Sequence, residues 1–247
     1  MPTDPSTLAL LCALVLFAAV LYSSVGHAGA SAYLAAMSLF GVPPGQMKPA
    51  ALVMNILVAL VGTWRFTTAR LVPWRLLAPL AAASVPAAFA GGLVELPLRA
   101  HRLLLGAVLL FAAVRLVLPD RPGAHRLPPP APWLVLIGAG FGFVAGLTGV
   151  GGGIFLSPLF ILAGWADPRT TAGASVVFIL VNSIAGLAGY LLGNHAIPAA
   201  TGLLAAVAVA GGLYGSWLGS RRLAPLTLRR LLSGVLVIAG LKLLLTV

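Results

Sequence analysis

Charged residues are scarce in this chain, and acidic residues are the scarcest. Only 8% of the 247 residues are charged, and Asp and Glu together number four. They are Asp4, Glu95, Asp120 and Asp167. None lies near the middle of a long apolar run, whereas paired carboxylates and carboxylate metal sites need such groups together in one site. The shortage of acids therefore argues against most acid–base and metal-dependent enzyme classes.

Cysteine and histidine are also few. The single cysteine, Cys12, excludes an internal disulfide and a cysteine metal site. No two of the four histidines are spaced i, i+4, so an H-E-x-x-H zinc site is absent. Ser31 or Ser157 with His27 leaves one enzyme alternative open, an intramembrane enzyme acting on a lipid-soluble substrate, although no spacing supports it. We expect no cofactor, no metal and no catalytic residue.

Apolar residues dominate the composition. Sixty per cent of the residues are hydrophobic and the mean hydropathy is +1.08, whereas soluble domains carry about 25% charged residues. The long uncharged runs cover residues 8–25, 49–64, 76–94, 127–166 and 170–220. Because one span needs about 20 apolar residues, the two longest runs each have room for two elements. The sequence predicts an all-α, polytopic bundle of transmembrane helices in the lipid bilayer.

The formal net charge of +11 is explained by membrane topology. Basic residues cluster between the apolar runs, at 65–75, 115–126 and 221–230, as expected for cytoplasmic loops. No basic stripe with interleaved aromatics is present, so nucleic acid is not an expected partner. Asp4, in a leading segment without Lys or Arg, favours a retained first span over a cleaved signal peptide.

The two halves of the chain match each other at an offset of 123 residues. The glycine cluster at 26–29 falls on the cluster at 149–152, and the order of apolar runs, glycines and prolines agrees. Internal repeats of this kind are typical of secondary transporters. We predict a first transmembrane repeat over residues 1–118, a proline-rich linker over 119–132 and a second repeat over 133–247.

Charges and helix breakers predict ten helices. We place them at residues 8–25, 31–42, 49–65, 76–93, 101–118, 133–148, 154–165, 171–192, 197–219 and 229–247. The second helix of each half, at about 12 residues, covers about 18 Å of an about 30 Å hydrocarbon core. It is either half of a re-entrant hairpin or part of a broken or tilted span, which gives eight or ten membrane segments.

The arginine clusters favour ten crossings and inverted halves, because all three clusters then face the cytoplasm. Arg99 and Arg102 fall on the opposite side in this arrangement. Together with Lys242 they are interpreted as surface or snorkelling residues.

Glycines, small hydroxyls and amides are the groups at membrane depth. A glycine cluster before a short helix exposes backbone N–H groups at the positive end of the helix dipole, where an anion is the natural ligand. Inverted repeats would bring two such ends together near the midplane. The predicted substrate-binding residues are Gly26, His27, Gly29, Ser31, Asn55, Gly149, Gly151, Gly152, Gly153, Ser175 and Asn182. In the absence of a central carboxylate, His27 is expected to carry a coupling proton, with sodium as the alternative ion.

The stretch GFVAGLTGVGGGIFLSPLFILAG, followed by TTAGASVVFILVNSIAGLAGY, resembles the TauE/SafE family of sulfite exporters, also called TSUP transporters. The likeness lies in the GxGGG run before a short helix with a proline, and it extends over essentially the whole chain. The first half departs from this pattern at His27 and Ala28 within the run, and at Ala35 where the second half has Pro158.

The resemblance implies a multi-pass transporter in the cell inner membrane for small anions such as sulfite, organosulfonates or related carboxylated anions. It fixes neither the substrate nor the direction of transport. We therefore expect a secondary active anion transporter that works by alternating access, without an ATP-binding motif. The sequence allows a homo-oligomer and does not require one.

Overall fold

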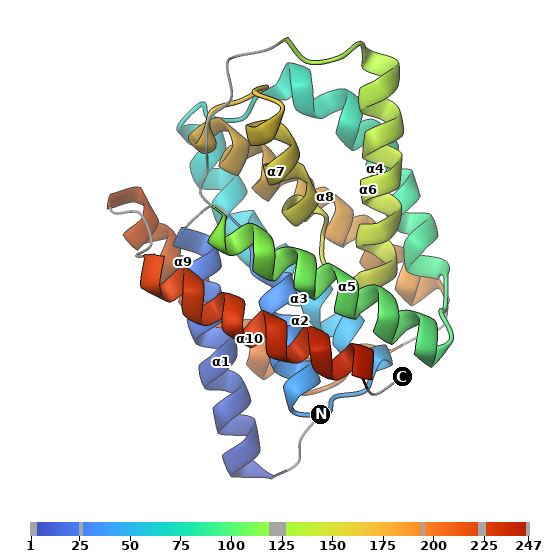
Figure 1. Cartoon of the computed structure of the whole chain (residues 1–247), viewed down its shortest axis with the longest axis vertical. Helices are drawn as coiled ribbons and strands as arrows, with labels where there is room; N and C mark the ends of the chain where they lie inside the picture. The colour runs from blue at the N-terminus through green and yellow to red at the C-terminus, as the bar shows by residue number, and fades with distance from the viewer. Residues whose placement is uncertain (1–3, 25–26, 119–126, 194–195, 222–225, 246–247) are drawn as a thin grey trace.

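The structure is a computed structural model that describes residues 4–24, 27–118, 127–193, 196–221 and 226–245. Within these residues the chain forms ten α-helices (Figure 1). They are α1 (Pro5–Ser24), α2 (Ala30–Leu39), α3 (Pro44–Thr68), α4 (Trp74–Leu93), α5 (Leu98–Val117), α6 (Ala131–Thr148), α7 (Gly153–Leu162), α8 (Pro168–Leu192), α9 (Thr201–Arg221) and α10 (Leu226–Leu245). The all-α prediction is confirmed, and each predicted helix corresponds to one observed helix.

Helices α3 and α8 begin earlier than predicted, because proline starts each of them. Pro44 and Pro168 occupy the first turn of their helices. Proline is favoured there, since the N–H that it lacks has no intrahelical acceptor at that position. Lys48 and Arg169, which bound the apolar runs in the sequence, therefore lie inside helices.

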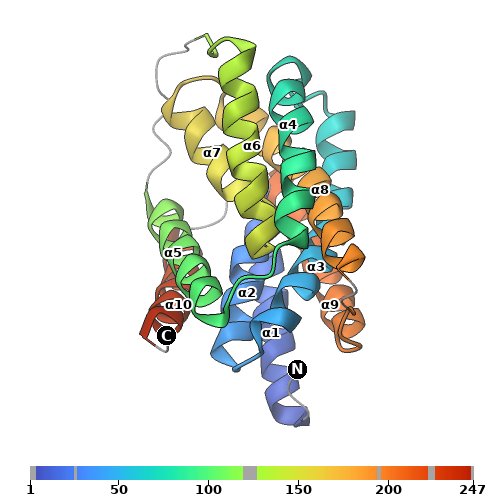
Figure 2. The ribbon, with the colours of Figure 1, turned by 90° about the vertical axis from the view of Figure 1, so that its right-hand side faces the viewer.

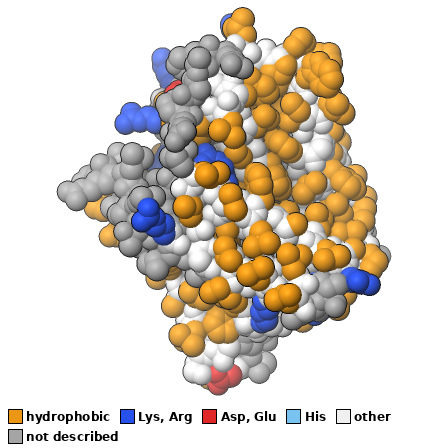
Figure 3. Space-filling view, viewed as in Figure 1, with side chains coloured by type: hydrophobic (Ala, Val, Ile, Leu, Met, Phe, Trp, Pro, Cys, Tyr) orange, Lys and Arg blue, Asp and Glu red, His pale blue; other side chains and the backbone are white. Residues whose placement is uncertain are grey.

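Five of the described helices, α1, α3, α4, α6 and α8, are long and apolar enough to cross a membrane. Helices α2 and α7 have 10 residues each and are therefore about 15 Å long. Apolar side chains cover most of the face seen in Figure 3, and basic side chains are few on it. These features describe a multi-pass membrane protein; the total of eight to ten membrane segments stays a prediction.

Helices from the two halves of the sequence pack against each other. Helix α4 makes its most extensive contact with α6 and also packs on α8, while α9 packs on α1 and α3. Helices α5 and α10 lie together at one side of the molecule (Figures 1 and 2). When α1–α5 are equated with α6–α10, the α4–α6 contact corresponds to α9–α1, and α4–α8 corresponds to α9–α3. These correspondences agree with the predicted repeat; the repeat and the inverted orientation of the halves stay predictions.

Glycines allow the closest of these helix pairs. Gly138, Gly142 and Gly146 form a stripe on α6, and a Cβ at Gly142 would lie 2.2 Å from the Ser84 carbonyl oxygen of α4. On α9, a Cβ at Gly215 would lie equally close, 2.2 Å, to the carbonyl oxygen of Val20 in α1. Small residues spaced by four let membrane helices approach to backbone contact. This close packing joins α4 to α6 and α1 to α9.

Candidate functional site

The second glycine cluster breaks the chain between two helices. Helix α6 ends at Thr148 and α7 begins at Gly153. Between them Gly149, Gly151 and Gly152 have φ values of +81°, +80° and +82°. This left-handed region is costly for residues with a Cβ, so the break depends on glycine at these three positions.

The first glycine cluster forms a similar break before α2. Helix α1 ends at Ser24, and α2 begins directly after Gly29, whose φ is +101°. The Tyr33 hydroxyl donates a 2.6 Å hydrogen bond to the carbonyl of Ala28, which fixes the loop against the first turn of the helix. The predicted site residue Gly26 lies outside the described residues.

The N-termini of both short helices are buried and have no side-chain cap. Gly29 and Gly152 are the N-cap residues, and neither position supplies a side-chain hydrogen bond. By contrast, α8 is capped by Asp167, whose carboxylate accepts bonds from the amides of Arg169 and Thr170. The buried residues at the two short-helix starts are Ala30, Ser31, Gly153 and Ile154. A buried helix start without a cap leaves N–H groups unsatisfied, and such groups are suited to an anion.

A chain of polar side chains joins the loop before α2 to α7 and α8. The Nε2 atom of His27 lies 2.8 Å from the Oγ of Ser157, which is in the second turn of α7. The same Ser157 hydroxyl lies 2.7 Å from the hydroxyl of Ser175 on α8. The loop before α2, the second turn of α7 and the third turn of α8 therefore meet, and the loop is far from the other two in the sequence.

Ser31 joins this cluster through a tyrosine. The Tyr22 hydroxyl and the Ser31 hydroxyl are 2.7 Å apart and both are buried. The Tyr22 ring also packs edge-on to the His27 ring, with 6.3 Å between the ring centroids. The prediction included Ser31 and His27 but omitted Tyr22, because an apolar helix end gives no sign that its tyrosine turns inward.

The two predicted asparagines differ in their surroundings. Asn55 on α3 contacts the second break, with Nδ2 3.4 Å from both the Val150 carbonyl oxygen and the Ser183 hydroxyl. Asn182 instead donates a 2.8 Å bond to the carbonyl of Phe178, one turn earlier in α8. In both asparagines the side-chain oxygen is buried without a hydrogen-bond partner in the described residues.

Sequence reasoning also missed a buried lysine. Lys48 is 5% exposed, and its Nζ donates to the carbonyl oxygens of Gly91 and Gly92 at 3.2 and 3.0 Å. It also lies 5.6 Å from the ring centroid of Tyr190. Carbonyls at a helix C-terminus attract a cation, so Lys48 stabilises the end of α4.

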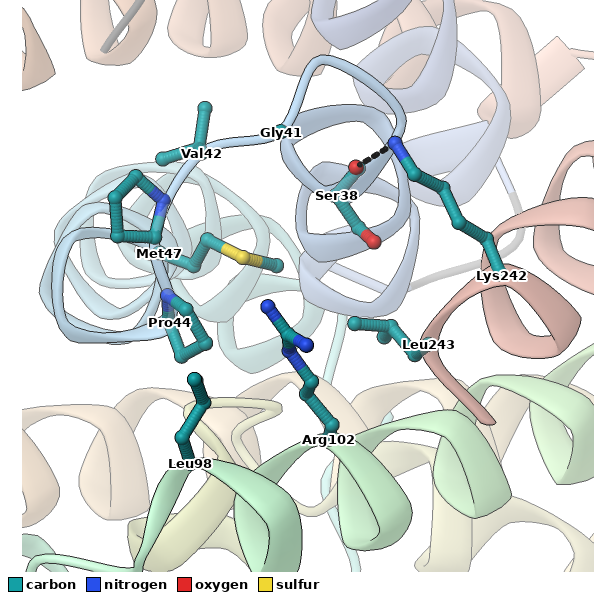
Figure 4. A pocket seen from close by; sticks show the side chains of 10 residues that line it. Ser38, Gly41, Val42, Pro44, Met47, Leu98, Arg102, Lys242 and Leu243 are labelled. Atoms are coloured by element: carbon teal, nitrogen blue, oxygen red, sulfur yellow. Dashed lines mark hydrogen bonds between the residues drawn. The ribbon is translucent and has the colours of Figure 1, made fainter. Parts of the chain in front are cut away.

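A cavity of about 290 Å³ lies at the other end of α2 (Figure 4). Arg102 from α5 reaches into it, and the Nζ of Lys242 from α10 donates to the carbonyls of Ser38 and Leu39 at 2.9 and 3.0 Å. The remaining lining residues are Gly41, Val42, Pro43, Pro44, Met47, Leu98 and Leu243. Lys242 is half-buried and has hydrogen-bond partners in the fold, at the end of α2. With two cations and no acidic lining residue, this cavity is a second place where an anion could bind.

The chain matches the family model of the sulfite exporter TauE/SafE over residues 11–243. This match covers nearly the whole chain. The chain belongs to the sulfite exporter TauE/SafE family. The family resemblance inferred from the glycine motif is thereby confirmed.

Two relatives of this TauE/SafE family member are named as probable membrane transporters. The chain is 38% identical to the probable membrane transporter protein y4hK of Sinorhizobium fredii, over 92% of this chain and 94% of that protein. It is 27% identical to the probable membrane transporter protein YjnA of Bacillus subtilis, over 92% of this chain and 96% of that protein. No solved structure gives a significant match. The family and these relatives together indicate a membrane transporter rather than an enzyme.

Proposed function

We propose that this TauE/SafE family member is a secondary active transporter of small anions across the cell inner membrane. Its substrates are sulfite, organosulfonates or related carboxylated anions, and it works by alternating access. The observation that carries this proposal is the pair of buried, uncapped helix N-termini, with Ser157 of α7 hydrogen-bonded both to His27, in the loop before α2, and to Ser175 of α8. The two starts, each preceded by left-handed glycine, supply N–H donors to one ligand.

The charge distribution favours an anion at this place. Asp4, Glu95 and Asp167, the acids in the described part of the chain, all lie outside the helices. The helix dipoles place partial positive charge at both short-helix starts, and the hydroxyls of Ser157 and Ser175 add neutral donors. An anion can therefore be bound there by neutral donors, without an arginine or lysine side chain at the site.

Unequal packing of the short helices supports alternating access. Helix α2 packs on both α5 and α10, whereas α7 packs mainly on α8. Between α7 and α5 the rings of Phe155 and Phe111 stack, with centroids 5.7 Å apart. In a transporter with inverted repeats, equivalent helices have unequal surroundings when one side of the site is closed and the other open.

Counterflow in proteoliposomes tests this function. Vesicles that contain the purified protein and unlabelled sulfite should transiently accumulate radiolabelled sulfite from outside, because the loaded carrier exchanges substrate without any ion gradient. Unlabelled isethionate and propionate in the external buffer should compete. Protein-free vesicles serve as the control. The assay is repeated with isethionate and then propionate as the labelled anion. An absence of counterflow for all three anions would contradict the proposal and would leave the intramembrane enzyme as the alternative.

The predicted proton role of His27 has a separate test. In the variant His27→Gln the side chain can still hydrogen-bond to Ser157, but it cannot carry a proton as an imidazole can. We expect uptake driven by a pH gradient to fall at least tenfold while sulfite counterflow at equal pH persists. Driven uptake that keeps the parent's pH dependence would show that His27 does not carry the coupling proton and would leave sodium as the coupling ion.

A further inference from the structure

The side chains of Asn55 and Ser183 pack against the second glycine break in the interior of the protein. Asn55 comes from α3 and Ser183 from α8, and both are 0% exposed. The backbone of Gly151 fits closely between them, since a Cβ there would lie 2.9 Å from Asn55 Nδ2 and 3.0 Å from Ser183 Oγ. Two helices and an unwound segment thus bring polar atoms together at one buried point.

The polar atoms at this point are poorly matched as hydrogen-bond partners. Asn55 Nδ2 lies 3.4 Å from the Val150 carbonyl oxygen and from the Ser183 hydroxyl, beyond the usual 2.7–3.2 Å for an N–H···O bond. The Oδ1 atom of the same amide is buried without a partner in the described residues. Rotating the amide by half a turn exchanges these two atoms, and which of them faces a given group is decided by the partners present there. Three oxygens then converge: Asn55 Oδ1, the Val150 carbonyl oxygen and the Ser183 hydroxyl.

We propose that Asn55, Ser183 and the Val150 carbonyl bind a sodium ion beside the second glycine break. Spacing supports this assignment. Two ligand oxygens at right angles around a cation, each about 2.4 Å from it, lie about 3.4 Å apart, whereas Mg²⁺ at about 2.05 Å needs about 2.9 Å. With Oδ1 in the place of Nδ2, which lies 3.4 Å from the Val150 carbonyl oxygen and 3.4 Å from the Ser183 hydroxyl, the spacing suits an ion of the size of Ca²⁺ or Na⁺.

Ligand charge distinguishes between these two ions. Amide, carbonyl and hydroxyl oxygens are all neutral, whereas Ca²⁺ sites use carboxylates. No group of three or more His, Cys, Asp or Glu side chains that could hold a metal occurs in the described part of the chain. Unwound carbonyls beside broken helices are also the ligands that sodium takes in secondary transporters. The neutral ligands therefore favour a monovalent ion, Na⁺, over Ca²⁺.

The position of this ion links it to the proposed anion site, and its role in transport rests on that proposed function. The same loop supplies the Val150 carbonyl to the cation and, from Gly153 onward, the N–H groups of α7 to the anion. Opposite charges held a few residues apart attract each other, so each ligand should raise the affinity for the other by the same factor. A proton on His27 is a separate charge and is compatible with this site.

Sodium binding is tested on the purified full-length protein without substrate anion. Replacing choline chloride by sodium chloride at fixed ionic strength should raise the apparent melting temperature, because the ion binds the folded state. Potassium chloride should raise it much less. In Ser183→Ala the sodium concentration for half-maximal shift should rise at least tenfold, and in the control Ser216→Ala, whose hydroxyl bonds to Leu213 in its own helix, it should stay unchanged.

A gain-of-function variant gives a result that misfolding cannot produce. Asn55→Asp adds a carboxylate to the same three-oxygen set, so Ca²⁺ should stabilise this variant at concentrations at least tenfold below those that affect the parent. Equal stabilisation by sodium, potassium and choline, or an unchanged sodium response in Ser183→Ala, would overturn the proposal. Counterflow of sulfite without any sodium response would reject the sodium site alone, whereas sodium binding without counterflow would reject the transport function alone.

Discussion

The variant Gly142→Ala should have a free energy of unfolding about 1–3 kcal/mol lower than that of the parent, which is the usual cost of overpacking. Its Cβ would lie 2.2 Å from the Ser84 carbonyl oxygen and 2.6 Å from the Ser84 Cα, both in the backbone of α4. Backbone atoms cannot rotate away as a side chain can, so α4 and α6 must separate. Reversible unfolding in mixed detergent measures the free energy, and a thermal scan measures the corresponding fall in melting temperature.

Gly140 provides a matched control on the same helix. A Cβ at Gly140 meets no atom within 4 Å, so Gly140→Ala leaves the packing intact and adds helix propensity of up to about 1 kcal/mol. The two substitutions have the same chemistry, two residues apart. Equal stability of the two variants would contradict the close α4–α6 contact.

Local sequence signals predicted the helices well. Apolar runs, prolines and glycines act within a few residues, so the ten helices were predicted with errors of a few residues at most ends. The error at α3 arose because Lys48 ended the apolar run although Pro44 starts the helix. The glycine breaks were predicted for the same local reason, since a left-handed backbone needs glycine wherever it occurs.

Contacts between distant segments could not be predicted. Nothing in the sequence near His27 indicates Ser157, which lies 2.8 Å from it across the two halves of the chain. Helix α4 of the first half packs on α6 of the second, and α9 of the second half packs on α1 of the first. A match between the two halves in sequence does not reveal these contacts. Lys48 and Lys242 bind carbonyls at the ends of helices that are remote in sequence. Such contacts depend on tertiary packing rather than on local pattern.

The variant Ile154→Pro should weaken anion binding about ten- to hundredfold. Ile154 is the second residue of α7 after the N-cap Gly152, so proline fits the helical backbone there and removes one N–H. The preceding residue, Gly153, has no Cβ to clash with the proline ring. A hydrogen bond to a charged group contributes about 1.5–3 kcal/mol, and each 1.4 kcal/mol is a factor of ten in affinity. Titration calorimetry with sulfite gives the dissociation constant directly.

The control for this variant is Ile154→Ala. Alanine removes more of the buried side chain than proline does, yet it keeps the backbone N–H. We expect Ile154→Ala to be less stable than the parent but to bind sulfite within about threefold of it, because the donor remains. If the alanine variant lost as much affinity as the proline variant, the effect would come from packing and not from the N–H group.

The central claim is that one anion binds between the starts of α2 and α7, and locating a heavy anion tests it most directly. Selenite has the shape and charge of sulfite, and its selenium atom gives an anomalous signal in crystals of the protein. We predict a selenium peak whose oxygens lie about 3 Å from the amide nitrogens at the starts of both short helices, close to Ser157 and Ser175. A peak in the cavity lined by Arg102 and Lys242, with none at the glycine breaks, would contradict this account.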